Sequence, residues 1–243
     1  MKILCIGDSL VRGTVGVNWI QILSRRQNTW NLENAGLNGD TLSRVMTNLG
    51  AHVSRDNSYD FIVIGGGSND VLIPSFAKRG FLYRMAARKL LRENYRPAFY
   101  PGEFEHVLDA GITDVEQHCS ARIICLTMGC INEYIPDELN GKRAAFNEVI
   151  RDVAWNHGCR VADVGEKFEK YLIKHPGKDY LLNNFFNTVW FDRYQMCARA
   201  MDRLSAERGL QLTIDGIHLN SRGADIYANE VERQILRFGQ KFH

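Results

Sequence analysis

The first candidate for chemistry is a serine that directly follows a short apolar run. Gly7-Asp8-Ser9-Leu10 comes after the run from Lys2 to Ile6 and before a helix-like pattern. A serine there would lie at the carboxyl end of a strand, where open α/β sheets bind ligands, and near the positive end of a helix dipole. Its hydroxyl is a weak nucleophile and needs a base. Taken singly, these four residues favour a turn with a helix N-cap.

A base is available near the other end of the chain, in Asp215-Gly216-Ile217-His218. Around a glycine turn, the carboxylate of Asp215 can reach one ring nitrogen of His218 and leave the other nitrogen to accept the serine proton. Taken alone, this pair favours a solvated turn, and half of a metal site is a further alternative. The metal alternative lacks partners, because no other histidine pairs with a second His or Cys at ligand spacing: His52, His106, His118, His157, His175 and His243.

Acyl transfer also needs N–H donors aimed at the developing oxyanion, each contributing about 3 kcal/mol when well placed. The segment Asn34 to Thr41 puts glycines just ahead of a helix start, where a backbone N–H can face a ligand. Gly65 to Asp70 offers the side-chain amide of Asn69 as a second donor. Each segment alone favours a cap or turn residue, so the case for catalysis depends on their joint occurrence.

Apolar runs that alternate with helical patterns position these segments. The expected strands are Lys2–Ile6, Asn31–Asn34, Asp60–Ile64, Ala121–Leu126 and Cys159–Val164. The expected helices are Val17–Arg26, Leu42–Val53, Gly111–His118 and Arg143–His157. The continuous apolar runs are typical of strands buried on both faces, and the alternation predicts a parallel, doubly wound sheet.

Two stretches do not fit the alternation. We expect a single domain over residues 1–243 with insertions at about 74–110 and 168–212. The first insertion is rich in Arg, Lys and aromatic residues. This composition favours a solvated helix face whose arginine stems cover apolar surface, and a basic amphipathic helix touching a nucleic acid or membrane is the alternative. The second insertion is rich in aromatic residues and is either a satellite core or a lid over a ligand site.

Composition excludes several classes of protein. The chain has 243 residues with 30 Lys+Arg, 28 Asp+Glu and a net charge of +2, which argues against a nucleic-acid groove or a polybasic membrane anchor. The six cysteines are scattered without a C-x-x-C pair, as in a protein with reduced thiols. The first residues resemble a strand rather than a signal peptide, and no run approaches the length of a membrane span. We therefore expect a cytoplasmic protein without nucleic-acid partners or stable membrane insertion.

Together, in this order, the four segments resemble the SGNH (GDSL) family of serine esterases and lipases. The resemblance covers roughly residues 1–75, 120–165 and 213–237 and leaves both insertions unmatched. Leu219 departs from the family, where proline often follows the histidine. The resemblance implies a three-layer α/β/α sandwich with a flavodoxin-like, five-stranded parallel sheet, the SGNH hydrolase fold.

The resemblance also implies a role for each matching residue. Ser9 would be the nucleophile, with His218 as its base and Asp215 orienting the imidazole. Ser9 N–H, the donor glycine Gly39 (with Gly36 as the fallback) and Asn69 would form the oxyanion hole. Asp8 and Asp70 would support these residues. The implied mechanism uses no cofactor and no metal ion.

The expected function is therefore a serine esterase that works through an acyl-enzyme on a small-molecule ester. The preferred substrate is a short-acyl ester, such as an acetyl ester of a carbohydrate. A lipase or lysophospholipase, or an acyltransferase using the same site, remains an alternative. A non-catalytic doubly wound module that binds a phosphate or nucleotide is the alternative of another class; the sequence contains neither G-x-G-x-x-G nor a P-loop. The sequence does not determine the oligomeric state.

Overall fold

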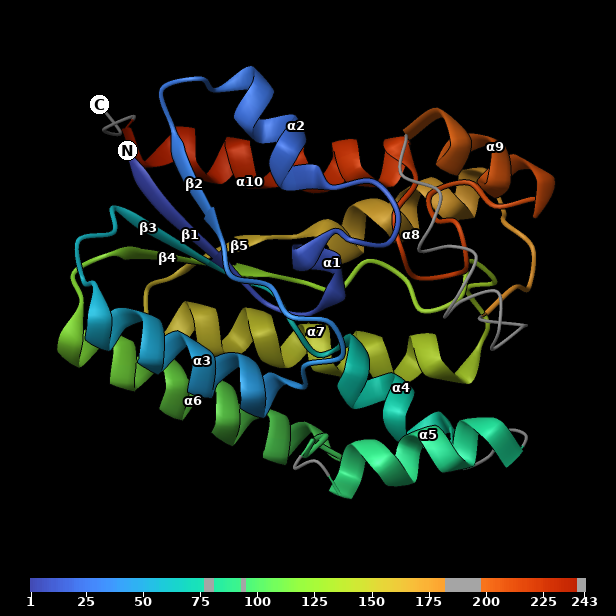
Figure 1. Cartoon of the computed structure of the whole chain (residues 1–243), viewed down its shortest axis with the longest axis horizontal. Coiled ribbons are helices and arrows are strands. Elements are labelled where there is room, and N and C mark those ends of the chain that lie inside the picture. The colour runs from blue at the N-terminus through green and yellow to red at the C-terminus, as the bar shows by residue number, and fades with distance from the viewer. Residues whose placement is uncertain (77–80, 93–94, 182–197, 240–243) are drawn as a thin grey trace.

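Five short strands form one parallel sheet at the centre of the molecule (Figure 1). They are β1 (Lys2–Ile6), β2 (Asn31–Asn34), β3 (Phe61–Ile64), β4 (Arg122–Leu126) and β5 (Arg160–Ala162), in the order β2-β1-β3-β4-β5. Every pairing is parallel, with Cys5 opposite Asn34 on one side and Val63 on the other. The predicted parallel, doubly wound sheet is confirmed. The computed structural model describes residues 1–76, 81–92, 95–181 and 198–239.

Helices cover both faces of the sheet, which gives three layers (Figure 1). One layer contains α3 (Leu42–Arg55), α6 (Pro101–His118) and α7 (Glu138–Asn156), and the other contains α2 (Trp19–Arg26), α8 (Val164–Lys174) and α10 (Ser221–Gly239). Their apolar residues recur at helical spacing and are buried, as in α3 at Leu42, Val45, Met46, Leu49 and Val53. α3 and α6 pack so closely that a Cβ on Gly111 would lie 2.5 Å from Sδ of Met46.

The remaining helices are α1 (Ser9–Arg12), α4 (Ser68–Phe76), α5 (Phe81–Arg92) and α9 (Ala198–Glu207). α1 and α4 follow β1 and β3, so they begin at the carboxyl edge of the sheet, and α5 and α9 lie farther out on that side (Figure 1). The last part of the second predicted insertion includes α9, but residues 182–197 lie outside the described residues.

Two helices begin earlier than the sequence pattern indicates. α6 begins at Pro101 rather than Gly111, and its first half buries Phe104 and Leu108 in the helix layer. Proline is favoured in the first helical turn, where its missing N–H costs nothing. α7 begins at Glu138 rather than Arg143, because Asp137 caps it by accepting a hydrogen bond from Leu139 N–H.

The cysteines lie within the fold as small apolar side chains. Cys5, Cys119, Cys125 and Cys130 are buried, Cys159 is half-buried, and all five are free. The sixth, Cys197, is outside the described residues. None of the described helices is long and apolar enough to cross a bilayer.

Candidate active site

The turn after β1 presents Ser9 at the carboxyl edge of the sheet. A Cβ on Gly7 would lie 2.1 Å from the carbonyl oxygen of Gly65, so only glycine allows β1 to leave the sheet beside β3. Asp8 caps α1 by accepting a hydrogen bond from Leu10 N–H at 2.9 Å, which makes Ser9 the first helical residue. Because α1 is a single turn that ends at Gly13, the helix dipole expected at Ser9 is that of one turn only.

A tight loop brings Asp215 and His218 together. Thr213 and Leu219 form an antiparallel bridge at its base, and Gly216 adopts φ +95°. At that glycine a Cβ would also lie 2.3 Å from the carbonyl oxygen of Tyr180. Leu219 is buried, and its carbonyl accepts a hydrogen bond from Val17 N–H at 2.7 Å, so the leucine at this position fits the local packing.

His218 connects the carboxylate of Asp215 to the hydroxyl of Ser9. Its Nδ1 lies 2.6 Å from Asp215 Oδ2, and its Nε2 lies 3.2 Å from Ser9 Oγ. The other carboxylate oxygen, Oδ1, accepts hydrogen bonds from Ile217 N–H at 3.0 Å and His218 N–H at 2.8 Å. The structure thus joins residues more than two hundred positions apart into one hydrogen-bonded chain.

The environment of Asp215 keeps it ionised. Its side chain is 1% exposed, and this burial by itself would raise its pKa. The neighbouring His218 charge and the hydrogen bonds from His218 and Ile217 outweigh burial and lower the pKa of Asp215 below its ordinary value. A carboxylate that stays ionised can hold a proton on Nδ1 and leave Nε2 free to accept one from the serine.

Asn69 and Gly39 approach the same edge of the sheet from the neighbouring segments. Asn69 lies in the first turn of α4, and its amide nitrogen donates to the carbonyl oxygen of Asp40 at 2.9 Å. Gly39, next to Asp40, adopts φ +84°, a conformation that favours glycine. Leu37 N–H donates to the carbonyl of Gly7 at 2.9 Å, so the glycine segment is attached to the serine turn.

Gly36 allows close backbone packing instead of presenting a free N–H group. A Cβ at this position would lie 2.3 Å from the backbone nitrogen of Arg12, so the glycine allows the second segment to pack directly on α1. Its N–H already donates to Oδ1 of Asn34 at 3.0 Å. Of the two glycines that the sequence offered as donors, Gly36 therefore has its N–H engaged.

The two supporting aspartates are buried. Asp70 accepts hydrogen bonds from Leu42 N–H at 2.9 Å and Ala98 N–H at 2.8 Å, so it connects the starts of α3 and α4 with the segment before α6. Burial is the main cause that raises the pKa of Asp70 to about 7, and the charge of Asp8 acts in the same direction. Burial also raises the pKa of Asp8. Asp70, and Asp8 through its Oδ1, therefore hold backbone around the site.

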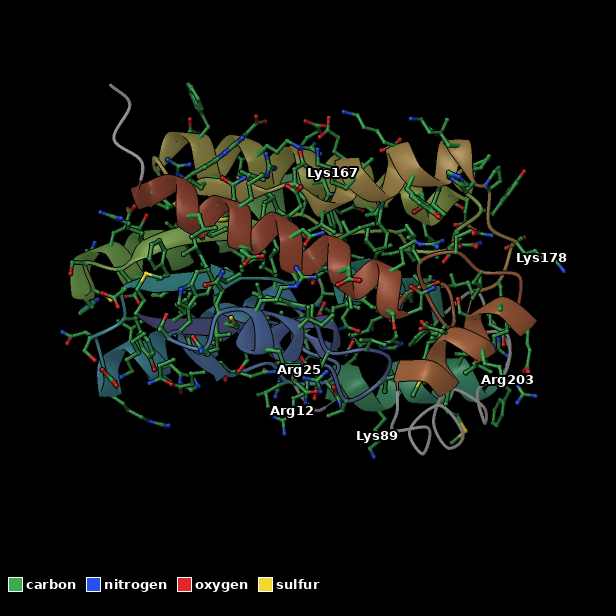
Figure 2. All side chains as sticks on the ribbon, turned by 90° about the horizontal axis from the view of Figure 1, so that it is seen from above. Arg12, Arg25, Lys89, Lys167, Lys178 and Arg203 are labelled. Carbon is green, nitrogen blue, oxygen red and sulfur yellow. The ribbon has the colours of Figure 1, made fainter. Side chains whose placement is uncertain are left out.

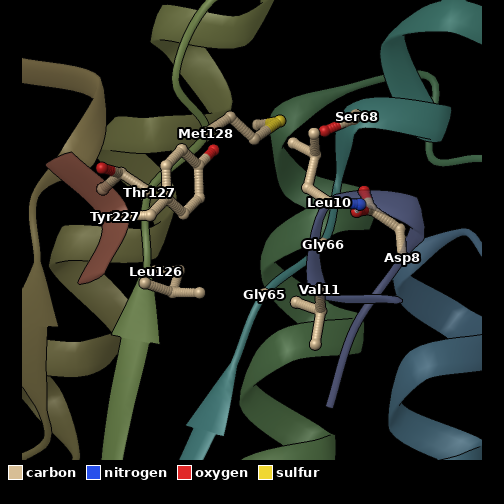
Figure 3. A pocket seen from close by; sticks show the side chains of 10 residues that line it. All are labelled: Asp8, Leu10, Val11, Gly65, Gly66, Ser68, Leu126, Thr127, Met128 and Tyr227. Atoms are coloured by element: carbon tan, nitrogen blue, oxygen red, sulfur yellow. Dashed lines mark hydrogen bonds between the residues drawn. The ribbon is translucent and has the colours of Figure 1, made fainter. Parts of the chain in front are cut away.

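A small cavity lies behind the serine turn (Figure 3). It lies between the carboxyl ends of β3 and β4, and its lining residues are Asp8, Leu10, Val11, Gly65, Gly66, Ser68, Leu126, Thr127, Met128 and Tyr227. Its volume of about 10 Å³ is room for a single water molecule. This cavity is therefore too small to hold an organic ligand.

Glu133 is a buried carboxylate near the site that was not among the residues expected from the sequence. It accepts hydrogen bonds from the backbone N–H groups of Gln211, Leu212 and Thr213 at 2.6, 2.8 and 2.7 Å, and from the Thr213 hydroxyl at 2.7 Å. It therefore holds the chain just ahead of Asp215. No local signal could identify it, because these partners are 78 to 80 residues away.

Three polar residues on the buried face of α7 hold the loop that carries Glu133. Asn147 accepts from Met128 N–H at 2.8 Å and donates to its carbonyl at 2.9 Å. Asn140 accepts from Ile131 N–H at 3.0 Å, and Arg143 donates to the Gly129 carbonyl at 2.8 Å. Their spacing of three and four residues places them on one helix face, so a polar stripe inside an apolar face was the signal that could have revealed them.

The described residues contain no group of three or more His, Cys, Asp or Glu side chains arranged to hold a metal ion. The aligned Asp215, His218 and Ser9 are suited to proton transfer from the serine, and the nearby N–H donors are suited to a developing negative charge. This arrangement is the one that acyl transfer requires.

Comparison with known families agrees with this chemistry. The model of the GDSL-like lipase/acylhydrolase family matches residues 5–226. The chain belongs to this family. Because lipases and acylhydrolases hydrolyse esters, the match confirms both the predicted SGNH (GDSL) membership and the prediction of an ester-bond hydrolase. A comparison with curated proteins gives no match.

Several solved structures share the fold. An acetyl xylan esterase, AlAXEase, has a TM-score of 0.68 and 19% identity, over 97% of this chain and 100% of that one. Axe2, an acetylxylan esterase from Geobacillus stearothermophilus, has a TM-score of 0.64 and 16% identity, over 96% and 93%. A lipase/acylhydrolase from Enterococcus faecalis has a TM-score of 0.61 and 18% identity, over 96% and 94%. At these identities the likeness shows the fold alone, and it confirms the predicted SGNH hydrolase fold.

Proposed function

We propose that this GDSL-family hydrolase is a serine esterase that works through an acyl-enzyme. Ser9 is the nucleophile, His218 is the general base and acid, and Asp215 orients the imidazole. The observation that carries the proposal is the continuous chain of contacts from Asp215 Oδ2 to His218 Nδ1 at 2.6 Å and from His218 Nε2 to Ser9 Oγ at 3.2 Å. Both distances are within the range expected of a nucleophile and its base before substrate binds.

The reaction then proceeds in two halves. Ser9 Oγ bonds to the ester carbonyl carbon while its proton passes to His218 Nε2, and the carbonyl electron pair moves to the oxygen. The tetrahedral intermediate collapses, the bond to the leaving alcohol breaks, and His218 gives that alcohol the proton. A water molecule repeats the sequence on the acyl-enzyme, and the acid leaves. If an alcohol or sugar hydroxyl replaced the water, the same residues would transfer the acyl group.

The oxyanion hole consists of Ser9 N–H, Gly39 N–H and the side-chain amide of Asn69. One hydrogen of the Asn69 amide is used on the Asp40 carbonyl at 2.9 Å, which fixes the amide and leaves its second hydrogen to donate to substrate. Gly39 is preferred to Gly36 as the backbone donor, because Gly36 N–H is already bonded to Asn34. Donors fixed in this way need no reorganisation when charge develops.

The substrate class that we favour is a short-acyl ester, in particular an acetyl ester of a carbohydrate or other small molecule. The support is the description of two of the most similar solved structures as acetyl xylan esterases. Chromogenic esters of increasing acyl length test this choice. The highest kcat/KM should fall on the acetate, and a maximum on a long acyl chain would replace it with a lipase-type activity.

An activity-based probe tests the nucleophile directly. Purified protein should react with a fluorophosphonate, and peptide mass spectrometry should locate the adduct on Ser9. The Ser9→Ala variant should show neither the adduct nor ester turnover, while circular dichroism shows an intact fold. Labelling at another residue, or turnover that survives in Ser9→Ala, would remove Ser9 from the mechanism.

A further inference from the structure

The outer face of α5 combines exposed apolar and basic side chains. Phe81, Arg84, Met85 and Arg88 recur at the spacing that places residues on one helix face, and all four are exposed. Phe81 is 66% exposed and Met85 is 52% exposed. On the inner side, the Tyr83 ring packs on Phe76 of α4 with 5.3 Å between centroids. α5 is thus attached to the molecule by one face and presents the other to solvent.

The sequence favoured a solvated helix face for this segment, and these exposures support the alternative of an interaction surface. Arginine stems can cover apolar surface, but Phe81 and Met85 would then be shielded, and they are more than half exposed. Exposed apolar side chains that form one stripe are a feature of interaction surfaces. The stripe therefore fits a surface that another body covers.

The charge of α5 indicates the kind of partner. The helix contains four Lys or Arg residues and no Asp or Glu, although the whole chain has a net charge of only +2. Figure 2 shows one of the four, Lys89, on the outer edge of the molecule. A second copy of the chain is disfavoured, because a symmetric contact would bring Arg84 and Arg88 against their own copies. Met85 suits an acyl-chain boundary better than base stacking, which argues against a nucleic acid.

We propose that α5 docks this protein on an anionic phospholipid surface, with the apolar side chains entering the headgroup boundary and the arginines facing lipid phosphates. A short helix that combines a basic face with Phe, Leu or Met lies in the plane of such an interface. The protein would bind the surface of the bilayer without spanning it, and this docking does not depend on the proposed catalytic mechanism.

The position of α5 gives the docking a consequence for access to the site. α4, which carries Asn69 at its start, leads into α5, and the segment after α5 returns to the glycine loop, where a Cβ on Gly39 would lie 3.6 Å from the Tyr95 ring. The Arg44 guanidinium, 4.1 Å from the centroid of that ring, holds Tyr95 in place. Docking through α5 would therefore place Asn69 and Gly39, the proposed oxyanion donors, on the side of the molecule that faces the bilayer.

Vesicle co-sedimentation tests the proposal. The full chain should bind vesicles of phosphatidylglycerol mixed with phosphatidylcholine, bind pure phosphatidylcholine weakly, and lose affinity in about 0.5 M salt. The Arg84→Gln/Arg88→Gln variant should bind the anionic vesicles about 25-fold more weakly, because each of the two basic residues near such a surface contributes about fivefold. The Phe81→Ser/Met85→Ser variant should bind vesicles more weakly than the wild type both in low salt and in about 0.5 M salt.

The matched control removes the same charge elsewhere. Lys167→Gln/Lys170→Gln changes two lysines of α8, on the opposite side of the molecule from Lys89 in Figure 2, and should leave vesicle binding unchanged. All variants should hydrolyse a water-soluble ester at the wild-type rate, which separates failed docking from a damaged site.

Three results would overturn the proposal. One is wild-type protein that does not bind anionic vesicles, and another is an equal loss of binding in the α5 and α8 variants. The third is sedimentation of the wild type as a dimer that the Phe81→Ser/Met85→Ser change dissociates, because the face would then belong to a second copy of the chain.

Discussion

Replacing Asp215 with asparagine should lower activity by about 10⁴-fold by fixing the wrong tautomer of His218 rather than by displacing the ring. In the wild type, Oδ1 of Asp215 accepts hydrogen bonds from Ile217 N–H and His218 N–H, while Oδ2 faces Nδ1 of the imidazole at 2.6 Å. An asparagine can place its single oxygen at only one of these two positions. We expect the oxygen at the Oδ1 position, because the two backbone N–H donors there need an acceptor.

The structure gives the size of that preference. Turning the amide over would set its NH2 group against two N–H donors and cost about 2 to 6 kcal/mol in lost buried hydrogen bonds. The asparagine oxygen therefore stays at the Oδ1 position, and its NH2 group donates to Nδ1 of His218. The ring proton must then be on Nε2, which faces Ser9 Oγ at 3.2 Å and can no longer accept its proton. A tautomer trap of this kind lowers kcat by about 10⁴-fold, or about 5 kcal/mol of barrier.

The assay combines kinetics with a direct view of the ring. Asp215→Asn should reduce kcat on a chromogenic acetate ester to about 10⁻⁴ of the wild-type value, with a small change in KM. Nitrogen NMR of labelled histidine should show the proton on Nδ1 in the wild type and on Nε2 in the variant. Asp215→Ala is the matched comparison. Unlike asparagine, alanine leaves the N–H groups of Ile217 and His218 without an acceptor, so this variant should lower the melting temperature as well as the rate. An Asp215→Asn enzyme that keeps more than about a tenth of its kcat would refute the reasoning.

Three further changes test other parts of the site and fold. Asn69→Ala should lower kcat by about 10²- to 10³-fold with KM nearly constant, and steady-state kinetics showing only a higher KM would exclude it from the oxyanion hole. Glu133→Gln should lower the free energy of unfolding by about 2 kcal/mol, because the amide oxygen would keep the three donors at Oε1 and the NH2 group would face Gln211 N–H; an unchanged urea midpoint would contradict this. Partial burial alone would lower the pKa of His157, but hydrogen bonds to Asp109 and Glu116 raise it above 6.5. The stabilisation from His157 is therefore complete below about pH 6.5 and lost as pH rises through the raised pKa, so the difference in unfolding free energy between wild type and His157→Gln should shrink as pH rises above about 6.5.

The sequence predicts the sheet and the site segments well, because both depend on short-range patterns. A buried parallel strand is a run of apolar residues that ends at a turn, as Lys2–Ile6 ends at Gly7. Since parallel strands end at the same edge, Ser9 after β1 and Asn69 after β3 had to lie near each other once the strands were identified.

The helix boundaries were less predictable because the signals at helix ends compete with the apolar pattern. The predicted helix over Gly111–His118 covers only the second half of α6, yet Phe104, Leu108, Ile112 and Val115 form one buried face through the whole helix. Spacing over the longer window would have extended the helix to its observed start. The placement of α5 outside the helix layers has no such signal, because its amphipathic pattern is compatible with either a buried or an exposed position.

The contacts that hold the site together could not be predicted, because the partners are far apart in the sequence; Asp70 was expected to support the site, but its bonds were not, and Glu133 was not identified at all. Asp70 binds the backbone N–H groups of Leu42 and Ala98, and Glu133 binds those of three residues just before Asp215. A carboxylate that accepts several backbone donors can fix the position of a loop without contacting substrate. Each candidate site segment is short and recognisable, while the distances between segments depend on long-range hydrogen bonds of buried carboxylates, of which Asp70 lies within a motif and Glu133 lies outside all of them. It follows that changes at Asp70 or Glu133 should affect kcat through geometry, even though neither side chain takes part in the proposed reaction.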